Sequence, residues 1–130
     1  MPNSSKQRVL VVEDDVARAN VLQAELEDAG FAVLRAANGD DGLRIAIADK
    51  PDIVLLDILL PGIDGLAVLQ KLREDEWGKH VPVIMLTNLS PDTHILESVE
   101  RDTPLYYVVK SNTSMEDIIT KVRDGLKGRQ

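Results

Sequence analysis

The stretch DIVLLDILLPGIDG, residues 52–65, combines a short apolar run, a single acid and a turn-rich segment. The apolar run at residues 53–56 is too short for a helix, and its unbroken aliphatic side chains are typical of a strand buried on both faces. Asp57 ends this strand. The proline and glycines that follow predict a loop, after which leucines resume at helical spacing. This stretch therefore predicts a buried strand, a loop that begins beside an acid, and a helix.

The same unit recurs along the chain. Four further apolar runs, each typical of a strand, lie at residues 9–12, 31–34, 83–86 and 105–109. Amphipathic segments follow the strands and predict helices at residues 16–29, 38–48, 66–72, from 90 onward, and after 113 up to 126. Asn38, Ser90 and Thr113 are the expected N-caps of three of these helices. Strict alternation of buried strands and helices predicts an α/β fold, a five-stranded parallel sheet with helices on both faces.

Composition narrows the class of protein. The chain has 130 residues, the size of one domain, and we expect a flexible segment at residues 1–7, one domain over 8–127 and a short tail at 128–130. The formal net charge of -7 argues against non-specific nucleic-acid binding, which depends on cationic surface. The absence of cysteine excludes disulfides, thiolate metal sites and cysteine nucleophiles, and 2 histidines are too few for a multi-histidine metal site.

We expect neither a membrane span nor a signal peptide in this sequence. No apolar run approaches the ~18 residues of a membrane span. The first residues lack the apolar core and the small-residue cleavage site of a signal peptide. The expected location is therefore the cytoplasm.

Chemically active side chains follow four of the five predicted strands. Glu13 and Asp14 follow the first strand, Asp57 the third, Thr87 the fourth and Lys110 the fifth. Because the carboxyl ends of parallel strands share one edge of a sheet, these groups meet if their strands are neighbours. Three crowded carboxylates repel one another unless a cation neutralises them. Oxygen ligands suit Mg²⁺, so the sequence predicts a magnesium site at this edge.

Four motifs in this order and spacing resemble the receiver domain of two-component response regulators. They are VLVVEDD at residues 9–15, DIVLLDILLPGIDG at 52–65, VIMLTN at 83–88 and YVVK at 107–110. The resemblance runs from residue 8 to about residue 127. It implies a flavodoxin-like receiver fold with strand order 2-1-3-4-5.

The resemblance also implies a role for each residue of the predicted site. Asp57 would accept a phosphoryl group, and Lys110 would contact a phosphoryl oxygen. Mg²⁺ would be held by Glu13, Asp14, Asp57 and the backbone carbonyl of Leu59. The implied reactions are Mg²⁺-dependent self-phosphorylation and slow autodephosphorylation, and the protein would not be a metabolic enzyme.

Signalling would begin at Thr87 and Tyr107. The resemblance implies that Thr87 moves toward the phosphoryl group and that Tyr107 changes rotamer in response. The output face would comprise the fourth helix, the fifth strand and the last helix. The implied partners are a sensor histidine kinase or a histidine phosphotransfer protein and an output protein of unknown identity, with a second copy of the chain as a further candidate. Neither nucleic acid nor a membrane is an expected partner.

Two departures from the family pattern predict local differences. The family usually places a proline after the lysine, in a cis peptide, whereas this chain has Ser111, which predicts a differently shaped loop after Lys110. A Gly-Ala pair commonly precedes the fifth strand, whereas this chain has RDTP at residues 101–104. We therefore expect a remodelled link between the fourth helix and the fifth strand.

Apolar residues lie two positions after the acceptor and two after the threonine. In the resembling family these positions flank the approach of the hydrolytic water, and here they are Leu59 and Leu89. Neither side chain can orient a water molecule, so the sequence predicts a long-lived phosphoryl group.

Three other functions remain open at the level of sequence. The first is a pseudo-receiver that binds a partner constitutively, which the change at Ser111 favours and the intact acids disfavour. The second is a Mg²⁺-dependent phosphatase similar to the haloacid dehalogenase family. Leu59 stands where that family has its second aspartate. The third is a flavodoxin-like flavin binder, which lacks support because no Ser/Thr-rich loop follows the first strand.

Overall fold

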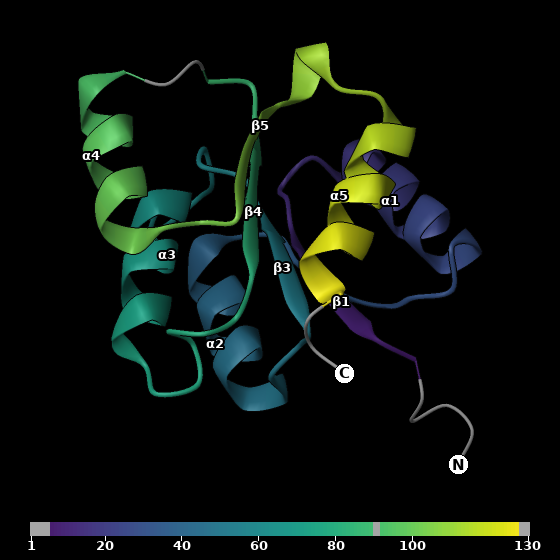
Figure 1. Cartoon of the computed structure of the whole chain (residues 1–130), viewed down its shortest axis with the longest axis horizontal. Helices are drawn as coiled ribbons and strands as arrows, with labels where there is room; N and C mark the ends of the chain where they lie inside the picture. Colours follow the sequence, from purple (N-terminus) through teal and green to yellow (C-terminus); the bar gives the residue numbers. More distant parts are fainter. Residues whose placement is uncertain (1–5, 90–91, 128–130) are drawn as a thin grey trace.

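The computed structural model describes residues 6–89 and 92–127 and contains one five-stranded parallel sheet (Figure 1). The strand order is β2-β1-β3-β4-β5, as the resemblance implied. The strands are β1 (Arg8–Val12), β2 (Ala32–Ala36), β3 (Ile53–Leu56), β4 (Val83–Thr87) and β5 (Tyr106–Val109). β1, β3 and β4 are central and almost entirely buried, because helices cover both faces of the sheet.

Helices lie on both faces of the sheet, as predicted. They are α1 (Val16–Asp28), α2 (Gly39–Asp49), α3 (Gly65–Glu74), α4 (Thr93–Asp102) and α5 (Met115–Leu126). α1 and α5 cover one face, and α2, α3 and α4 cover the other (Figure 1). None of the helices within residues 6–89 and 92–127 is long and apolar enough to cross a membrane.

The starts of three helices test the predicted N-caps. The side chain of Asn38 accepts a hydrogen bond from the backbone N–H of Asp41 at 2.7 Å, which confirms this cap of α2. The cap of α5 is Ser114 and not Thr113, because the Ser114 hydroxyl accepts the Asp117 N–H. The Thr113 hydroxyl is bonded instead to the carbonyl of Val109.

The start of α4 also differs from the prediction. Its N-cap is Asp92, whose carboxylate accepts the N–H of Ile95 at 2.9 Å. The predicted cap Ser90 and the proline after it lie outside the described residues, as do residues 1–5 of the predicted flexible segment and the tail at 128–130. Aspartate caps a helix as well as serine does, so Asp92 takes the role predicted for Ser90.

The core consists of two apolar clusters separated by the sheet. On one side Leu10, Leu56 and Met85 pack under α2, α3 and α4. On the other side Val9 and Leu55 pack under α1 and α5. Alternate residues of each strand serve opposite faces, as the pleat of a strand requires. This packing fixes the strands in register and brings the ends of β1, β3, β4 and β5 to one edge.

Candidate functional site

A lysine and two carboxylates from three strand ends form a buried ion cluster. Lys110 Nζ donates hydrogen bonds to Glu13 Oε1 at 2.6 Å and to Asp57 Oδ2 at 2.8 Å. The three side chains are only 4–10% exposed. Such burial of charge is costly, so two carboxylates at this depth depend on the single ammonium between them.

Asp14 brings a third carboxylate to the cluster from the solvent side. Carboxylate oxygens of Glu13, Asp14 and Asp57 lie within 4.8 Å of one another, and Asp14 is exposed whereas the other two are buried. Clustered carboxylate oxygens, open to water on one side, match the ligand preference of Mg²⁺ for a few carboxylates with retained waters. The residues therefore fit a hard divalent cation.

The backbone around Asp57 holds its carboxylate in one orientation. Asp57 Oδ1 accepts the N–H of Ile58 at 2.7 Å and faces that of Leu59 at 3.4 Å. The N–H of Gly65, at the start of α3, donates to the carbonyl of Ile58 at 2.8 Å. Leu59 is 61% exposed. The loop that follows β3 thus folds back against Asp57, and Leu59 is exposed to solvent next to this carboxylate.

Gly65 lies so close to the backbone of Asp57 that no larger residue fits. A Cβ atom at this position would lie 2.0 Å from the carbonyl oxygen of Asp57. We expect Gly65→Ala to lower the free energy of unfolding by about 1–3 kcal/mol, because backbone must move to relieve the overlap. Gly125→Ala is the matched control. The nearest atoms to its Cβ would be side-chain ends of Ile53 and Leu105 at 2.8 Å and the Cβ of Pro82 at 4.0 Å, and none of these is a backbone atom. Equal urea midpoints for the two variants would contradict this reading.

Thr87 and Tyr107 are joined through the segment that leaves β4. Thr87 is fully buried, and its Oγ1 lies 3.4 Å from the N–H of Leu89. The Tyr107 hydroxyl donates to the carbonyl of Leu89 at 2.7 Å. Burial raises the pKa of Tyr107, and the nearby carboxylates of Asp92 and Asp57 raise it further. The predicted switch residues, Thr87 and Tyr107, are therefore linked through the backbone of Leu89.

The loop with Ser111 still brings Lys110 to the site. Residues Lys110–Asn112 form a 3₁₀ turn, and the described part of the chain contains no cis peptide bond. The Thr113 hydroxyl donates to the carbonyl of Val109 at 3.1 Å and closes the turn. The missing proline has therefore not displaced the lysine from the two carboxylates.

The link between α4 and β5 contains an arginine clamp that sequence reasoning missed. The Arg73 guanidinium donates to four carbonyls at 2.7–3.1 Å, those of Gly78, Val81, Asp102 and Thr103. Thr103 has φ 40°, a left-handed conformation that favours glycine. The clamp supplies the hydrogen bonds that hold this turn without a glycine. Only an arginine in the last turn of α3 marked it in the sequence.

A second residue missed by sequence reasoning lies at the site itself. Arg18 Nε in the first turn of α1 is 3.9 Å from Glu13 Oε1. Its only sequence signal is its place five residues after Glu13, in the helix turn that follows the acids.

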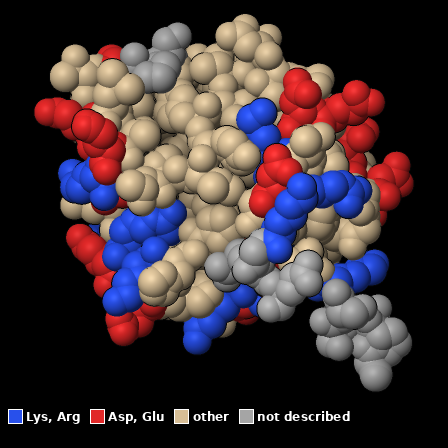
Figure 2. All heavy atoms as spheres, in the orientation of Figure 1, with Lys and Arg blue, Asp and Glu red and all other residues tan. Residues whose placement is uncertain are grey.

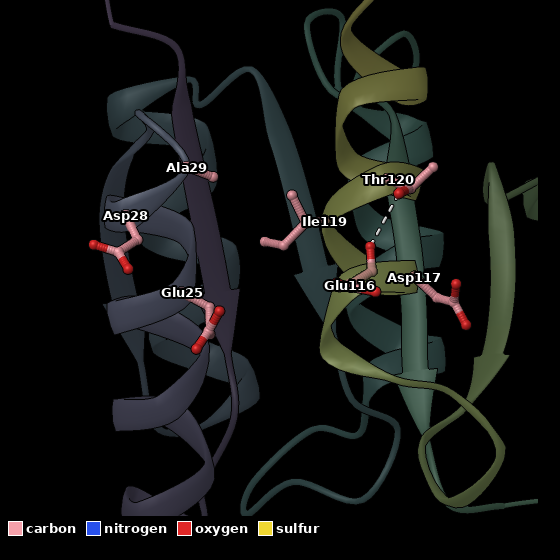
Figure 3. A pocket seen from close by; sticks show the side chains of 7 residues that line it. All are labelled: Glu25, Asp28, Ala29, Glu116, Asp117, Ile119 and Thr120. Carbon is pink, nitrogen blue, oxygen red and sulfur yellow. Dashed lines mark hydrogen bonds between the residues drawn. The ribbon is translucent and has the colours of Figure 1, made fainter.

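A separate groove lies between α1 and α5. Its volume is about 430 Å³, and Figure 3 shows acidic residues on both helices, with Ile119 pointing into the space between them. The lining residues are Glu25, Asp28, Ala29, Glu116, Asp117, Ile119 and Thr120. None of them belongs to the ion cluster, and the acidic walls disfavour a phosphate. The strand ends are the better place for an anionic ligand, because two cations, Lys110 and Arg18, lie there.

Comparisons with known proteins agree with this geometry. The chain is 33% identical over 127 residues to the response regulator PleD of Caulobacter vibrioides, covering 89% of this chain and 28% of PleD. It is 40% identical over 86 residues to the protein PilH of Pseudomonas aeruginosa, covering 66% of this chain and 71% of PilH. The chain thus spans less than a third of PleD.

Solved structures show the same fold. A CheY-like receiver domain protein from Methanospirillum hungatei superimposes with a TM-score of 0.87 at 25% identity, covering 95% of this chain and 96% of the other. A putative response regulator from Chloroflexus aurantiacus has a TM-score of 0.83 at 30% identity, covering 94% and 98%. The family model of the response regulator receiver domain matches residues 9–123. The chain therefore belongs to the family of response regulator receiver domains.

Proposed function

We propose that this domain accepts a phosphoryl group on Asp57, with Mg²⁺ bound at Glu13 and Asp14, and passes the signal on by protein–protein contact. The observation that carries the proposal is the ion cluster, in which Lys110 lies 2.8 Å from Asp57 Oδ2 beside two further carboxylates. Family membership leaves the phosphatase and flavin-binding alternatives without support. The donor would be a sensor histidine kinase or a histidine phosphotransfer protein in the cytoplasm.

The chemistry follows from the hydrogen bonds of the Asp57 carboxylate. Its Oδ1 is held by backbone N–H groups, so Oδ2 is the oxygen that attacks phosphorus once Lys110 shifts toward a phosphoryl oxygen. Phosphoryl transfer depends mainly on positioning and charge neutralisation. Bound Mg²⁺, held by Glu13, Asp14, Asp57 and the carbonyl of Leu59, would supply positive charge to the phosphoryl oxygens. Lys110, which holds Asp57 Oδ2 before transfer, would then neutralise charge on a phosphoryl oxygen.

Acetyl phosphate and intact-mass measurement test the acceptor role. With Mg²⁺ the wild-type protein should gain the mass of one phosphoryl group, and Asp57→Asn should gain none. A wild-type mass that stays unchanged would leave constitutive partner binding, the pseudo-receiver reading, as the better account. A gain of mass in Asp57→Asn would place the acceptor elsewhere.

Metal binding gives a prediction that does not depend on phosphate. Mg²⁺ should raise the melting temperature of the wild-type protein, because a ligand that binds only the native state stabilises it. A concentration of 100 times the Kd adds about 2.7 kcal/mol. Asp14→Ala should remove most of this increase. Asp28→Ala, which changes an acid of the separate groove, should leave it intact. A wild-type melting temperature that ignores Mg²⁺ would refute the roles of Glu13 and Asp14.

The proposed output face comprises α4, β5 and α5. Figure 2 shows that its middle is largely uncharged, with charged side chains mainly toward the two sides. Leu96 on α4 and Leu105 before β5 are 54% and 46% exposed. Tyr107 joins this face to the site through Leu89. Exposed apolar side chains beside the edge strand β5 are suited to a protein partner or a second copy.

Hydrogen exchange tests whether the face responds to the site. Binding of a phosphoryl mimic such as beryllofluoride should change amide exchange in residues 87–89 and 106–110, because Thr87 and Tyr107 both contact Leu89. Tyr107→Phe lacks the hydroxyl that bonds to Leu89. In this variant the mimic should change amide exchange less in β5, and as much as in wild type near Thr87. Exchange that is identical with and without the mimic across these residues would rule out the switch.

A further inference from the structure

Two cations of different exposure converge on one oxygen of Glu13. Lys110 Nζ lies 2.6 Å from Glu13 Oε1 and is buried, with 7% of its side chain exposed. Arg18 Nε lies 3.9 Å from the same oxygen, with 41% of its side chain exposed. Lys110 therefore faces the interior of the site, whereas Arg18 borders it on the solvent side.

Glu13 does not need Arg18 to satisfy its hydrogen bonds. Its Oε1 accepts from Lys110, and its Oε2 accepts the N–H of Asp15 at 3.2 Å. The 3.9 Å separation from Arg18 exceeds a hydrogen bond. Among residues 6–89 and 92–127 no hydrogen bond involves the Arg18 guanidinium. Its donors are thus available to a ligand that arrives from solvent.

The charge balance of the site indicates what this ligand is. Glu13, Asp14 and Asp57 carry three negative charges, and Lys110 cancels one of them. A divalent cation cancels the remaining two and leaves the site neutral. Arg18 then adds the positive charge that attracts an anionic phosphoryl donor. The same guanidinium repels the divalent cation, because both are positively charged and both lie beside Glu13.

We propose that Arg18 recognises the phosphoryl oxygens of a dianionic donor such as an acyl phosphate, and that it does so at the expense of Mg²⁺ affinity. This inference rests on the proposed function. In the step concerned, an Asp57 oxygen forms a bond to phosphorus while the bond from phosphorus to the acyl oxygen breaks. The carboxylate leaves with the electron pair, and no proton is required. Arg18 stabilises the charge on the phosphoryl oxygens throughout.

Two small donors of different charge test the inference on Arg18→Gln. The rate of phosphorylation by acetyl phosphate, a dianion, should fall about two- to fivefold, the factor expected for a partly exposed charge pair. Phosphoramidate, a monoanion near neutral pH, should lose less. Mg²⁺ should bind Arg18→Gln more tightly than wild type, measured by the dependence of the melting temperature on Mg²⁺. Arg18→Lys should restore part of the rate with acetyl phosphate.

Arg35→Gln is the matched control for net charge. Arg35 follows Leu34 in β2, and its guanidinium is held by Asn20 at 2.7 Å and Gln23 at 3.1 Å instead of by a carboxylate. This variant should keep both phosphorylation rates and the Mg²⁺ affinity of wild type within twofold. Tighter metal binding together with slower phosphorylation in Arg18→Gln is a pair of effects that general destabilisation does not produce.

Four results would overturn this inference and leave the proposed function standing. Three are an unchanged rate in Arg18→Gln, an equal fall with both donors, and an Arg35→Gln variant that behaves like Arg18→Gln. The fourth is weaker Mg²⁺ binding in Arg18→Gln, since it would make Arg18 a support of the metal site. If wild type accepts no phosphoryl group from either donor, the proposed function falls first and this inference falls with it.

Discussion

Replacing Leu59 by asparagine is expected to shorten the lifetime of the phosphorylated protein about tenfold or more, because asparagine can orient the attacking water. Hydrolysis needs a water in line with the bond between Asp57 and phosphorus. Leu59 lies two residues after Asp57, is 61% exposed and has its N–H 3.4 Å from Asp57 Oδ1. An apolar side chain there can shield the phosphoryl group but cannot position water. Phosphate loss after removal of the donor is the measurement.

Leu89 gives a weaker version of the same test. It is half-buried and packs against the apolar cluster under α2, α3 and α4, and its carbonyl accepts the Tyr107 hydroxyl. Leu89→Glu should therefore speed phosphate loss less than Leu59→Asn, and it should also lower the free energy of unfolding. Leu59→Val keeps an apolar side chain and is the control. Decay in Leu59→Asn that is as slow as in Leu59→Val would contradict the shielding argument.

Removing the buried ammonium has the second large effect. Lys110→Met should lower the free energy of unfolding by about 3 kcal/mol in metal-free buffer, because Glu13 and Asp57 are left buried with no cation between them. Mg²⁺ should restore much of this loss, since it binds the same carboxylates. The stabilisation by Mg²⁺ should thus be larger in Lys110→Met than in wild type. Urea unfolding with Mg²⁺ and with a chelator measures both quantities.

Lys79→Met is the control for loss of a lysine. Lys79 pairs with Glu76 on the surface, with 48% and 89% of the two side chains exposed, and such pairs contribute little. This variant should unfold within about 0.5 kcal/mol of wild type with and without Mg²⁺. A Lys110→Met variant that also unfolds like wild type in chelator would show that Glu13 and Asp57 do not depend on the ammonium.

Much of the fold could be predicted because its signals are local. Short unbroken apolar runs and intervening amphipathic segments fix strands and helices, and alternation of the two fixes a parallel sheet. The ends of elements were less certain, because several neighbouring residues can cap a helix. At α5, Thr113 and Ser114 both offer a hydroxyl, and the bond from Thr113 to Val109 decides between them.

The site was predictable where residues follow strands and less so where they reach it from helices. The topology alone brings Glu13, Asp57 and Lys110 to one edge, so their meeting follows from the strand order. Arg18 and Arg73 reach their partners through long side chains from helices. The spacing of residues in the sequence does not predict such contacts. The clamp of Arg73 joins carbonyls from two segments of the chain, at Gly78 and at Asp102, which the fold brings together.

The central claim is that Asp57 carries the phosphoryl group, and reductive trapping tests it most directly. After incubation with Mg²⁺ and acetyl phosphate, borohydride reduces an acyl phosphate to an alcohol, which converts the modified aspartate to homoserine. Peptide mass mapping should then find homoserine at position 57, with Glu13 and Asp14 unchanged. Homoserine at position 14, or no reduced residue in a protein that has gained phosphate, would contradict the claim.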